Sequence, residues 1–522
     1  MMKIRGNILW VDDEIEHLKP HILFLKEKGY NLEIANNGED AIALTKKEHF
    51  DLILLDQSMP GMDGLEVLSR IKKNRHSQIV IMITKTEDEW LMDEVITSQV
   101  EQLLFKPVNP NQIFMACKQA LEKNSLSEKK ATRDYLKEFQ HINDKLRENL
   151  DHDDWWNIYD NLIEWQLKFD LYKDIGLNSI LEEQIQTCNK EFSVFIEQMY
   201  TGWLQKKEGP TLSTDIFEKY VKPELDIENK VCLLVVDCMR HDHFKSIQPL
   251  LETLFTIDID YKFSLLPTAT PYSRNAIFSG MFPDDMVKKY PQQSEDMQND
   301  VSSLNQHEKT FLQDQLTRFK LEKKDMHYHK IWAVQEGKKF ENRIKDYLQK
   351  DMLGLVVNFV DILAHNSSQS GVLKEMVPDE TGYRLAVKSW FENSWLLGVL
   401  KELSANNWTV ILTSDHGSIR VQNDIMVAAD KGASSGVRYK FGRNLNTNKK
   451  GALVIKEPEL YKLPNFGPQP SYVIAKEDNY FVYPNDIHKY QNKFKNSFQH
   501  GGISMEEMMV PIAVMRSKKN DN

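Results

Sequence analysis

Short apolar runs alternate with amphipathic stretches over the first 122 residues of the chain. The apolar runs have the length of buried strands, and the stretches between them have helical spacing. Alternation of this kind predicts βαβ units, in which a parallel sheet carries helices on both faces. We therefore expect one α/β domain over residues 1–122. Its predicted strands are Ile8–Val11, Asn31–Ala35, Leu52–Leu55, Ile79–Ile83 and Gln102–Phe105.

The pattern changes over residues 123–208, where helical periodicity alone remains and glycine is nearly absent. Apolar residues recur at intervals of three and four, which predicts a small helical bundle. Its aromatic stripe is predicted to be core, with a partner groove as the alternative. The stripe includes Tyr135, Phe139, Trp155, Trp156, Tyr159 and Trp165.

Strand and helix signals alternate again over residues 209–518, which we interpret as one large α/β domain with insertions. Two stretches are predicted to be inserted, the polar segment Pro283–Lys309 and the basic segment Lys431–Lys450. The expected architecture is thus a flavodoxin-like α/β domain, a helical linker and a second, larger α/β domain.

Composition narrows the function classes. The chain has 522 residues and a net charge of −11, from 66 Lys+Arg and 77 Asp+Glu, which disfavours a passive polyanion binder. Its four cysteines lack CxxC spacing, which favours a reducing, cytoplasmic setting. The apolar run near the N-terminus is too short for a signal peptide, and later runs are too short to span a bilayer, so no membrane insertion is expected.

Five polar residues follow four of the predicted strands in the first domain. They are Asp12, Asp13, Asp56, Thr84 and Lys106. The carboxyl ends of parallel strands meet at one crevice, so these side chains should lie together. Three close carboxylates require a compensating cation, and oxygen ligands suit Mg²⁺. The alternative is that each aspartate merely caps the next helix and that the lysine is a surface residue.

These residues, with the turn Gln57–Gly64 after Asp56, resemble the receiver domain of two-component response regulators. The resemblance implies that Asp56 accepts a phosphoryl group, that Asp12 and Asp13 bind Mg²⁺, and that Thr84 and Lys106 sense and neutralise the phosphoryl charge. Many receivers carry Tyr or Phe at the position of Leu103, so the route from phosphorylation to the output surface is open.

A second set of acids and histidines follows predicted strands of the large domain. A strand over Val231–Val236 ends in Asp237, a strand over Leu355–Val360 ends in Asp361, and a strand over Thr409–Thr413 leads to Asp415. Chemistry divides the set into two groups, each with carboxylate and imidazole ligands that suit Zn²⁺. One group is Asp361, His365 and His500, and the other is Asp237, Asp415 and His416, with the Thr270 hydroxyl completing it.

Two adjacent cations can stabilise the attacking and leaving oxygens of a phosphoryl displacement, with Thr270 as nucleophile. Each element alone is weak, because a lone histidine such as His500 is more often structural. Their order and the segment Pro267–Gly280 resemble the alkaline phosphatase superfamily, which includes phosphodiesterases, sulfatases and PglZ domains. The resemblance implies Thr270 rather than Thr268 as nucleophile; Thr268 is expected to position or pack.

Other polar residues of the large domain are given lesser roles. Arg240 and Asp242 are expected next to the metal ligands, His241 and His243 either at the site or at the surface, and His327 and His329 in structural or exposed positions. The segment Lys431–Lys450 contains six basic residues and no acid. Its Arg438, Lys440 and Arg443 are predicted to bind substrate phosphates, with a solvated basic loop as the alternative.

The order of the three domains resembles the PorX-type response regulators. That resemblance implies a regulator of type IX secretion, with a PorY-type sensor histidine kinase, a sigma factor and a secretion motor component as partners. It also implies phosphodiesterase activity on oligonucleotide or cyclic nucleotide substrates. We expect Asp56 phosphorylation to favour a homodimer. The alternatives are a catalytically silent metal-containing scaffold and a monoester phosphatase or sulfatase; direct DNA binding is disfavoured, because the bundle shows no helix-turn-helix with a basic recognition helix.

Overall fold

The computed structural model describes most of the chain as two compact units, each treated by itself. One unit is built from residues up to Glu138, together with Leu171, and the other from Phe139–Asp170 and the described residues from Leu177 onward. The described residues are 6–75, 77–85, 100–171, 177–205, 208–292, 306–367, 375–429, 434, 436–447, 450–466 and 470–518, without the side chains of 122–130.

The first unit contains a five-stranded parallel sheet of order β2-β1-β3-β4-β5. Its strands are β1 (Gly6–Val11), β2 (Tyr30–Ala35), β3 (Leu52–Asp56), β4 (Val80–Thr84) and β5 (Gln102–Phe105). Alternate residues face opposite sides of a strand. Trp10 and Leu54 accordingly pack against the helices α1 (Lys19–Glu27) and α5 (Pro110–Lys145), whereas Val11 and Leu55 pack against α2 (Gly38–Lys47) and α3 (Gly64–Asn74). The predicted flavodoxin-like fold is confirmed.

Local signals in the sequence fix the helices between these strands, which are α1 (Lys19–Glu27), α2 (Gly38–Lys47) and α3 (Gly64–Asn74). The side chains of Asn37 and Asp63 accept hydrogen bonds from backbone N–H groups of the first turn of α2 and α3. Gly64 lies against β3, since a Cβ there would sit 2.4 Å from the carbonyl oxygen of Asp56. The loop after Asp56 therefore packs closely on the strand end.

Three long helices follow: α5 (Pro110–Lys145), α6 (His152–Leu171) and α7 (Asn178–Gln205). Trp155 of α6 lies edge-on to Phe192 of α7, with ring centroids 5.3 Å apart. Trp155, Tyr159 and Trp165 are buried, as the core interpretation predicts. Trp156 instead stacks on Tyr261 of the following domain, at 4.6 Å and 9° between the ring planes. The aromatic stripe thus serves the bundle core and its contact with the next domain.

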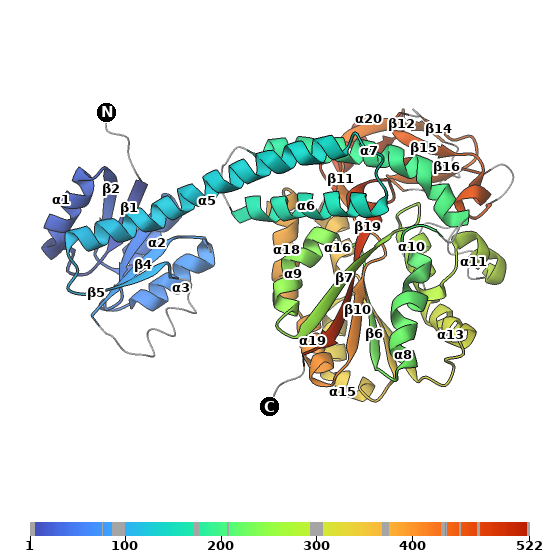
Figure 1. The fold of residues 1–522 in the computed structure, drawn as a ribbon, viewed down its shortest axis with the longest axis horizontal. Helices are drawn as coiled ribbons and strands as arrows, with labels where there is room; N and C mark the ends of the chain where they lie inside the picture. The colour runs from blue at the N-terminus through green and yellow to red at the C-terminus, as the bar shows by residue number, and fades with distance from the viewer. Residues whose placement is uncertain are drawn as a thin grey trace. The chain divides into compact units, whose positions relative to one another are not determined.

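The rest of the second unit is organised around a six-stranded sheet of order β7-β19-β10-β6-β9-β8 (Figure 1). The four strands from β10 to β8 are parallel, and β19 is antiparallel to both its neighbours. The strands are β6 (Val231–Val236), β7 (Phe255–Phe263), β8 (Met326–Ile331), β9 (Met352–Val357), β10 (Thr409–Thr413) and β19 (Met509–Ser517). This fold agrees with the predicted second α/β domain.

One predicted strand is wrong at its end. The run Leu355–Val360 was expected to be strand as far as Asp361, but β9 stops at Val357 and α16 (Phe359–Ser367) begins two residues later. Asp361 therefore lies in the first turn of a helix, and His365 one turn further along the same face. An apolar run alone does not distinguish a buried strand from a buried first turn.

Helices cover both faces of this sheet, and each face has its own apolar core (Figure 1). One core joins the sheet to α9 (His241–Leu251), α14 (Val334–Asn342), α15 (Ile344–Tyr347), α16, α18 (Glu380–Glu392) and α19 (Trp395–Ala405). The other joins it to α8 (Lys222–Asp226), α10 (Thr270–Ser279), α11 (Pro283–Lys289) and α13 (Glu308–Arg318). Of the stretches predicted to be inserted, residues 293–305, 431–433, 435 and 448–449 lie outside the described residues.

Short strands and helices in the last hundred residues build smaller sheets beside the main one. They are β11 (Ile419–Arg420), β12 (Asn423–Ala428), β13 (Tyr439–Gly442), β14 (Asn446–Thr447), β15 (Ala452–Ile455), β16 (Ser471–Ala475), β17 (Asn479–Val482), α20 (Ile487–Phe494), β18 (Phe498–Gln499) and α21 (Met505–Met508). The two-stranded pair β11-β18 places the segment after His416 next to the segment before His500. Among the helices of the described residues, none combines the length and apolar character needed to cross a membrane.

Candidate functional site

The first candidate site lies at the carboxyl ends of β1, β3 and β5. Lys106 Nζ lies 2.9 Å from Asp12 Oδ2 and 3.0 Å from Asp56 Oδ2. Thr84, at the end of β4, donates from Oγ1 to Gln57 Oε1 at 3.3 Å. All five residues predicted for this pocket therefore come from the expected strand ends, with Asp12, Asp56 and Thr84 buried and Asp13 exposed.

The electrostatics of this pocket favour a cation. Burial raises the pKa of Asp56, and Lys106 only partly offsets that effect. Burial by itself would lower the pKa of Lys106, but its bonds to Asp12 and Asp56 outweigh burial and raise it. Asp56 Oδ1 is buried without a hydrogen-bond partner, and oxygens of Asp12, Asp13 and Asp56 lie within 4.8 Å of one another. These oxygens fit a hard divalent ion such as Mg²⁺.

The second candidate site lies at the carboxyl edge of the six-stranded sheet, where one group of three ligands converges. His365 Nε2 lies 3.1 Å from His500 Nε2 and 3.3 Å from Asp361 Oδ1. His500 Nε2 lies 3.5 Å from the same carboxylate oxygen. One nitrogen of each imidazole and one carboxylate oxygen thus lie within 4.8 Å of one another, a set of three protein ligands that would suit a metal ion.

A second group of three lies beside the first. His416 Nε2 is 3.8 Å from Asp415 Oδ2 and 3.9 Å from Asp237 Oδ1, and all three side chains are buried. The rings of His416 and His500 are stacked with centroids 4.2 Å apart, which places the two groups next to each other. The structure thus brings together the same two sets of three that the sequence analysis separated by chemistry.

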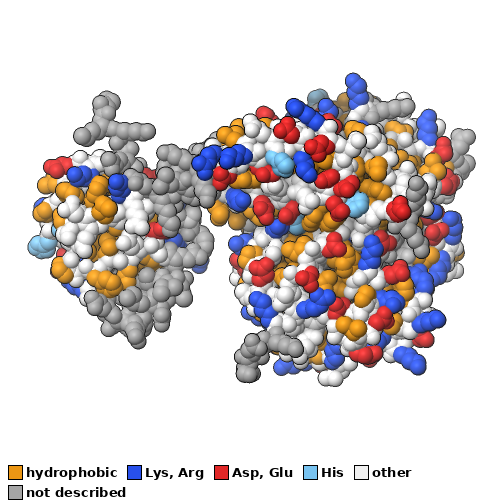
Figure 2. All heavy atoms as spheres, in the orientation of Figure 1, with side chains coloured by type: hydrophobic (Ala, Val, Ile, Leu, Met, Phe, Trp, Pro, Cys, Tyr) orange, Lys and Arg blue, Asp and Glu red, His pale blue; other side chains and the backbone are white. Residues whose placement is uncertain are grey.

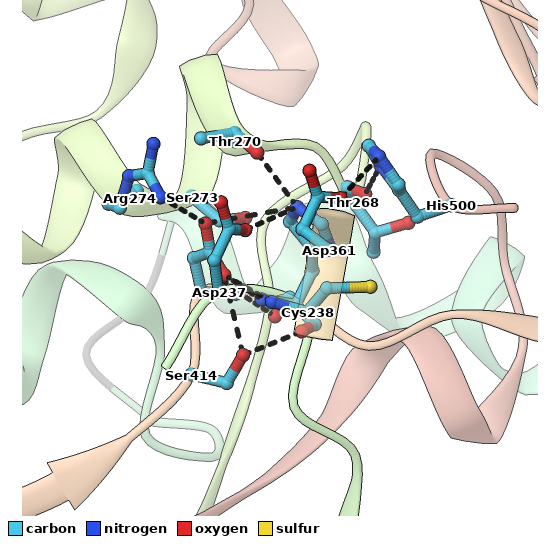
Figure 3. Close-up of polar contacts among 12 residues, drawn as sticks. Asp237, Cys238, Thr268, Thr270, Ser273, Arg274, Asp361, Ser414 and His500 are labelled. Atoms are coloured by element: carbon cyan, nitrogen blue, oxygen red, sulfur yellow. Dashed lines mark hydrogen bonds and ion pairs between the residues drawn. The ribbon is translucent and has the colours of Figure 1, made fainter. Parts of the chain in front are cut away.

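Thr270 is the first residue of α10 and reaches this site. Its Oγ1 lies 3.1 Å from His416 Nε2. In Figure 3, Thr270, Asp361 and Asp237 gather around one point, with Arg274 on the opposite side of Asp237. Thr268 is turned elsewhere, because its Oγ1 donates to the carbonyl oxygen of Gly502 and accepts from the N–H of Gly501. Thr268 therefore holds the loop that carries His500.

The side chains at this site do not by themselves compensate the charge of its carboxylates. Burial raises the pKa of Asp237, while Asp361 raises the pKa of His365. Burial and the neighbouring His416 lower the pKa of His500 to about 3. One oxygen of each carboxylate, Asp237 Oδ1, Asp361 Oδ1 and Asp415 Oδ2, is buried without a hydrogen-bond partner. Mixed imidazole and carboxylate ligands with orphaned oxygens fit divalent metals such as Zn²⁺.

Comparison with protein families matches the whole architecture. The model described as "BREX system PglZ alkaline phosphatase-like domain" matches residues 216–515, more than half of the chain. The chain belongs to the PglZ family. The response regulator receiver domain matches residues 8–118, and the PorX response regulator linker domain matches residues 125–204. The chain thus has the PorX-type architecture, its receiver implies a phosphorylating sensor kinase, and its PglZ domain indicates a hydrolase of the alkaline phosphatase superfamily.

Two curated relatives match about a quarter of the chain. The transcriptional regulatory protein ResD of Bacillus subtilis is 31% identical over 118 residues, which are 23% of this chain and 49% of ResD. ZraR of Klebsiella oxytoca is 32% identical over 138 residues, which are 26% of this chain and 31% of ZraR. The chain thus spans at most about half the length of these two relatives.

Two solved receiver domains are similar to about a quarter of the chain. A CheY-like receiver domain protein from Methanospirillum hungatei is 28% identical, with a TM-score of 0.23, and the match covers 24% of this chain and 99% of that one. A receiver domain from Vibrio parahaemolyticus is 27% identical, with a TM-score of 0.23, and the match covers 24% of this chain and 95% of that one.

The proposed phosphate-binding residues of the PglZ domain need correction. Arg438 is fully buried and forms two bonds with Glu507, from Nε to Oε1 at 3.1 Å and from Nη2 to Oε2 at 2.5 Å. Lys440 is also buried and donates to the carbonyl oxygens of Ser434 and Gly436. Neither cation is presented to solvent, so their prediction as substrate contacts is wrong for this conformation. Arg443 is exposed, and its role stays a prediction.

The histidines left open by the sequence lie inside the protein. His241 is buried and bonds through Nε2 to Asp160 of the linker at 2.6 Å. His243 is buried against the ring of Tyr383. Burial lowers the pKa of both imidazoles. His327 and His329 stack on Tyr347 and Phe340, in agreement with a structural role.

Sequence reasoning missed several polar residues that touch the ligand residues. Lys262 Nζ lies 3.1 Å from the carbonyl oxygen of Asp415, and Ser414 Oγ donates to the carbonyl oxygen of His416 at 2.7 Å. Arg274 donates to Asp237 Oδ2 at 2.7 Å. Arg274 carries the clearest sequence signal, because it stands one helical turn after Thr270 and so on the same face of α10.

Helices of the linker contact the loops that carry the candidate ligands. Asp160 of α6 bonds His241, which directly follows the loop that begins with Asp237. Asn189 of α7 donates to Glu506 Oε2 at 3.0 Å and accepts from the N–H of Met505 at 2.8 Å. The next residue, Glu507, accepts through its carbonyl oxygen from the N–H of Gly417. The linker therefore contacts the loops that carry the candidate metal ligands.

Proposed function

We propose that phosphorylation of Asp56 regulates a phosphodiesterase in the PglZ domain, with Thr270 as its nucleophile and two Zn²⁺ as its metals. The proposal is carried by one observation: Thr270 Oγ1 lies 3.1 Å from His416 Nε2, at the junction of two adjacent ligand sets. A scaffold that bound metals structurally would need no hydroxyl at this place.

Bound metals would supply the charge that stabilises the attacking and leaving oxygens of a phosphoryl displacement. Thr270 Oγ1 attacks phosphorus, its proton leaves to solvent, and the bond to the leaving alcohol breaks as that alcohol takes up a proton. Water then gives up a proton and attacks phosphorus, the bond between Thr270 Oγ1 and phosphorus breaks as that oxygen takes up a proton, and a phosphate monoester is released. The Thr270 oxygen lies beside His416 Nε2 and would share its metal, and α10 directs its N-terminal turn toward the substrate phosphate, a favourable place for an anion.

The distribution of charge on the surface favours a short substrate that binds at the site over a long one that follows a basic stripe. Over the face drawn in Figure 2, acidic and basic side chains of the PglZ domain are interspersed, in a chain of net charge −11. A duplex-binding protein draws on a basic stripe. Short linear or cyclic oligonucleotides, which present one or a few phosphates to the metals, fit this surface better than long duplexes.

Turnover of bis-nitrophenyl phosphate by zinc-loaded protein tests the proposal. We expect Thr270→Ala to lower kcat at least 1000-fold with metal content unchanged, since it removes the nucleophile. Thr270→Ser, which keeps a hydroxyl, is the matched control and should retain activity. Equal turnover by wild type and Thr270→Ala would refute the catalytic role and leave the metal-containing scaffold. Faster hydrolysis of the monoester or of a sulfate ester would favour the alternative hydrolases.

The regulatory part of the proposal is supported by the linker contacts. Phosphorylation is expected to stabilise a receiver conformer that pairs with a second copy, and the linker helices would pass that change to the ligand loops. Sedimentation with and without a beryllofluoride phosphoryl mimic measures the dimer. An unchanged monomer at micromolar concentration would contradict this part. Control of type IX secretion, through a PorY-type kinase, a sigma factor and a motor component, is proposed from the PorX-type linker.

A further inference from the structure

Arg274 is buried beneath the candidate metal site, on the same face of α10 as Thr270. Its side chain is 1% exposed. Nη1 donates to Asp237 Oδ2 at 2.7 Å and to Asn358 Oδ1 at 3.0 Å, and lies 3.8 Å from Asp415 Oδ2. One guanidinium nitrogen thus approaches two of the three residues of one ligand set.

Glu308 forms an ion pair with a different nitrogen of this guanidinium. Its Oε1 lies 3.0 Å from Arg274 Nε, and its side chain is also 1% exposed. Glu308 is itself fixed by Tyr328, whose hydroxyl donates at 3.0 Å, and by Lys330 Nζ at 3.2 Å. The guanidinium has little freedom to turn, because two of its nitrogens lie in ion pairs with different carboxylates and it is enclosed by protein.

We infer that Arg274 is a positioning residue that occupies one oxygen of Asp237 and so limits that carboxylate to one-oxygen metal binding. The inference rests on the proposed function only in taking Asp237 as a metal ligand. Asp237 Oδ2 is committed to Arg274, whereas Oδ1 has no hydrogen-bond partner and lies 3.9 Å from His416 Nε2. The ion pair thus directs the free oxygen to the side on which the ligand set converges.

Arg274 has a second consequence for the metal-free protein. Asp237 and Asp415 are buried carboxylates whose mutual repulsion is costly without a nearby cation. Arg274 supplies one permanent positive charge beside both of them. Its loss should therefore destabilise the metal-free protein more than the metal-loaded one, in which bound ions take over that compensation.

Arg274→Gln and Arg274→Lys in the full chain test the inference. Glutamine removes the positive charge and the guanidinium donors but leaves Glu308 paired with Lys330 and Tyr328, so we expect the Arg274→Gln protein to fold. Lysine keeps the positive charge but cannot contact Asp237 and Glu308 through two separate nitrogens, as the guanidinium does. Arg516→Gln is the control, since Arg516 pairs with Asp258 of β7 and Glu224 of α8 near the start of β10, at the edge of the sheet opposite Asp415.

Two readouts do not depend on turnover. With Co²⁺ in place of Zn²⁺, Arg274→Gln frees Asp237 to bind through both oxygens, so coordination number should rise and the visible absorption should weaken. The rise in melting temperature on metal loading should be larger for Arg274→Gln than for wild type and intermediate for Arg274→Lys. Arg516→Gln should change neither quantity.

Kinetics then separate positioning from substrate contact. Loss of a residue that orients a metal ligand typically costs 10–100-fold in activity or metal affinity. We expect kcat of Arg274→Gln to fall by roughly that factor with KM little changed. An unchanged Co²⁺ spectrum together with an unchanged melting shift would overturn the inference. If wild type binds Co²⁺ but hydrolyses no diester, the proposed function fails while the spectrum still decides the role of Arg274.

Discussion

Replacing Arg438 with Ala removes the cation from a buried ion pair that braces two candidate ligand loops. Arg438 and Glu507 are both fully buried and share two bonds. Glu507 also accepts from the N–H of Gly502 at 2.8 Å, in the loop of His500, and its carbonyl oxygen accepts from Gly417, next to His416. The variant therefore leaves a buried carboxylate without its counter-ion at the point where the two loops meet.

The expected magnitude follows from that burial. Breaking one side of a buried pair costs about 3–5 kcal/mol, because the remaining charge stays in a low-dielectric surrounding. Gly502 N–H and Ser504 Oγ still donate to Glu507, so we expect the lower end of this range, about 3 kcal/mol. The metal-binding affinity should fall as well, since His416 and His500 lose a shared support.

Urea unfolding of the zinc-free protein measures the first effect, and chelator competition for Zn²⁺ the second. Arg443→Ala is the matched control: Arg443 is exposed in the same basic segment, and exposed substitutions usually change stability by less than about 0.5 kcal/mol. If Arg438→Ala unfolds like wild type and loses only oligonucleotide affinity, then Arg438 contacts substrate and the brace interpretation is refuted.

Three further predictions concern pH, metals and the receiver. Burial raises the pKa of Glu506 to about 7, so between pH 4.5 and 7 the folded protein holds a proton that the unfolded chain has lost. The free energy of unfolding therefore falls as the pH rises through this window, by at most about 3 kcal/mol. Glu506→Gln should flatten this pH dependence in urea titrations; equal slopes would contradict it. Chelating divalent ions should lower the melting temperature of the PglZ domain, whose buried aspartate oxygens lose their compensation, and leave a separate receiver transition in place. Asp56→Asn should abolish phosphoryl transfer from acetyl phosphate, measured by intact mass, whereas Ser58→Ala on the adjacent turn should not.

The receiver pocket could be predicted from the sequence because its geometry follows from topology. Asp12, Asp56, Thr84 and Lys106 each stand at the carboxyl end of a parallel strand, and those ends must meet at one edge of the sheet. Similar reasoning placed Asp237 and Asp415 together. Asp361 reached the right edge despite the wrong secondary structure, because the first turn of a helix that follows a strand lies at the same edge.

The ion pairs behind the ligands could not be predicted in this way. Arg438 belongs to a basic segment without acids, a pattern typical of an exposed loop, and its partner Glu507 comes 69 residues later. Arg274 pairs with Glu308, which comes 34 residues later and lies inside the segment Pro283–Lys309 that was interpreted as an insertion. Local periodicity indicates whether a side chain is buried, but it contains no information on which distant acid compensates a buried arginine.

The contacts of the linker are a second feature that local periodicity does not reveal. Asp160 and Asn189 lie in helices whose pattern predicted only a bundle, yet they bond His241 and Glu506 beside the ligand loops. Such polar contacts are made or broken as units, since a buried partner left alone costs about 1–3 kcal/mol. A shift of either helix would therefore select between discrete arrangements of the ligand loops rather than deform them gradually. If the receiver controls hydrolysis, its control should be lost in Asp160→Asn and Asn189→Ala proteins that still bind metal, and retained if regulation acts through assembly alone.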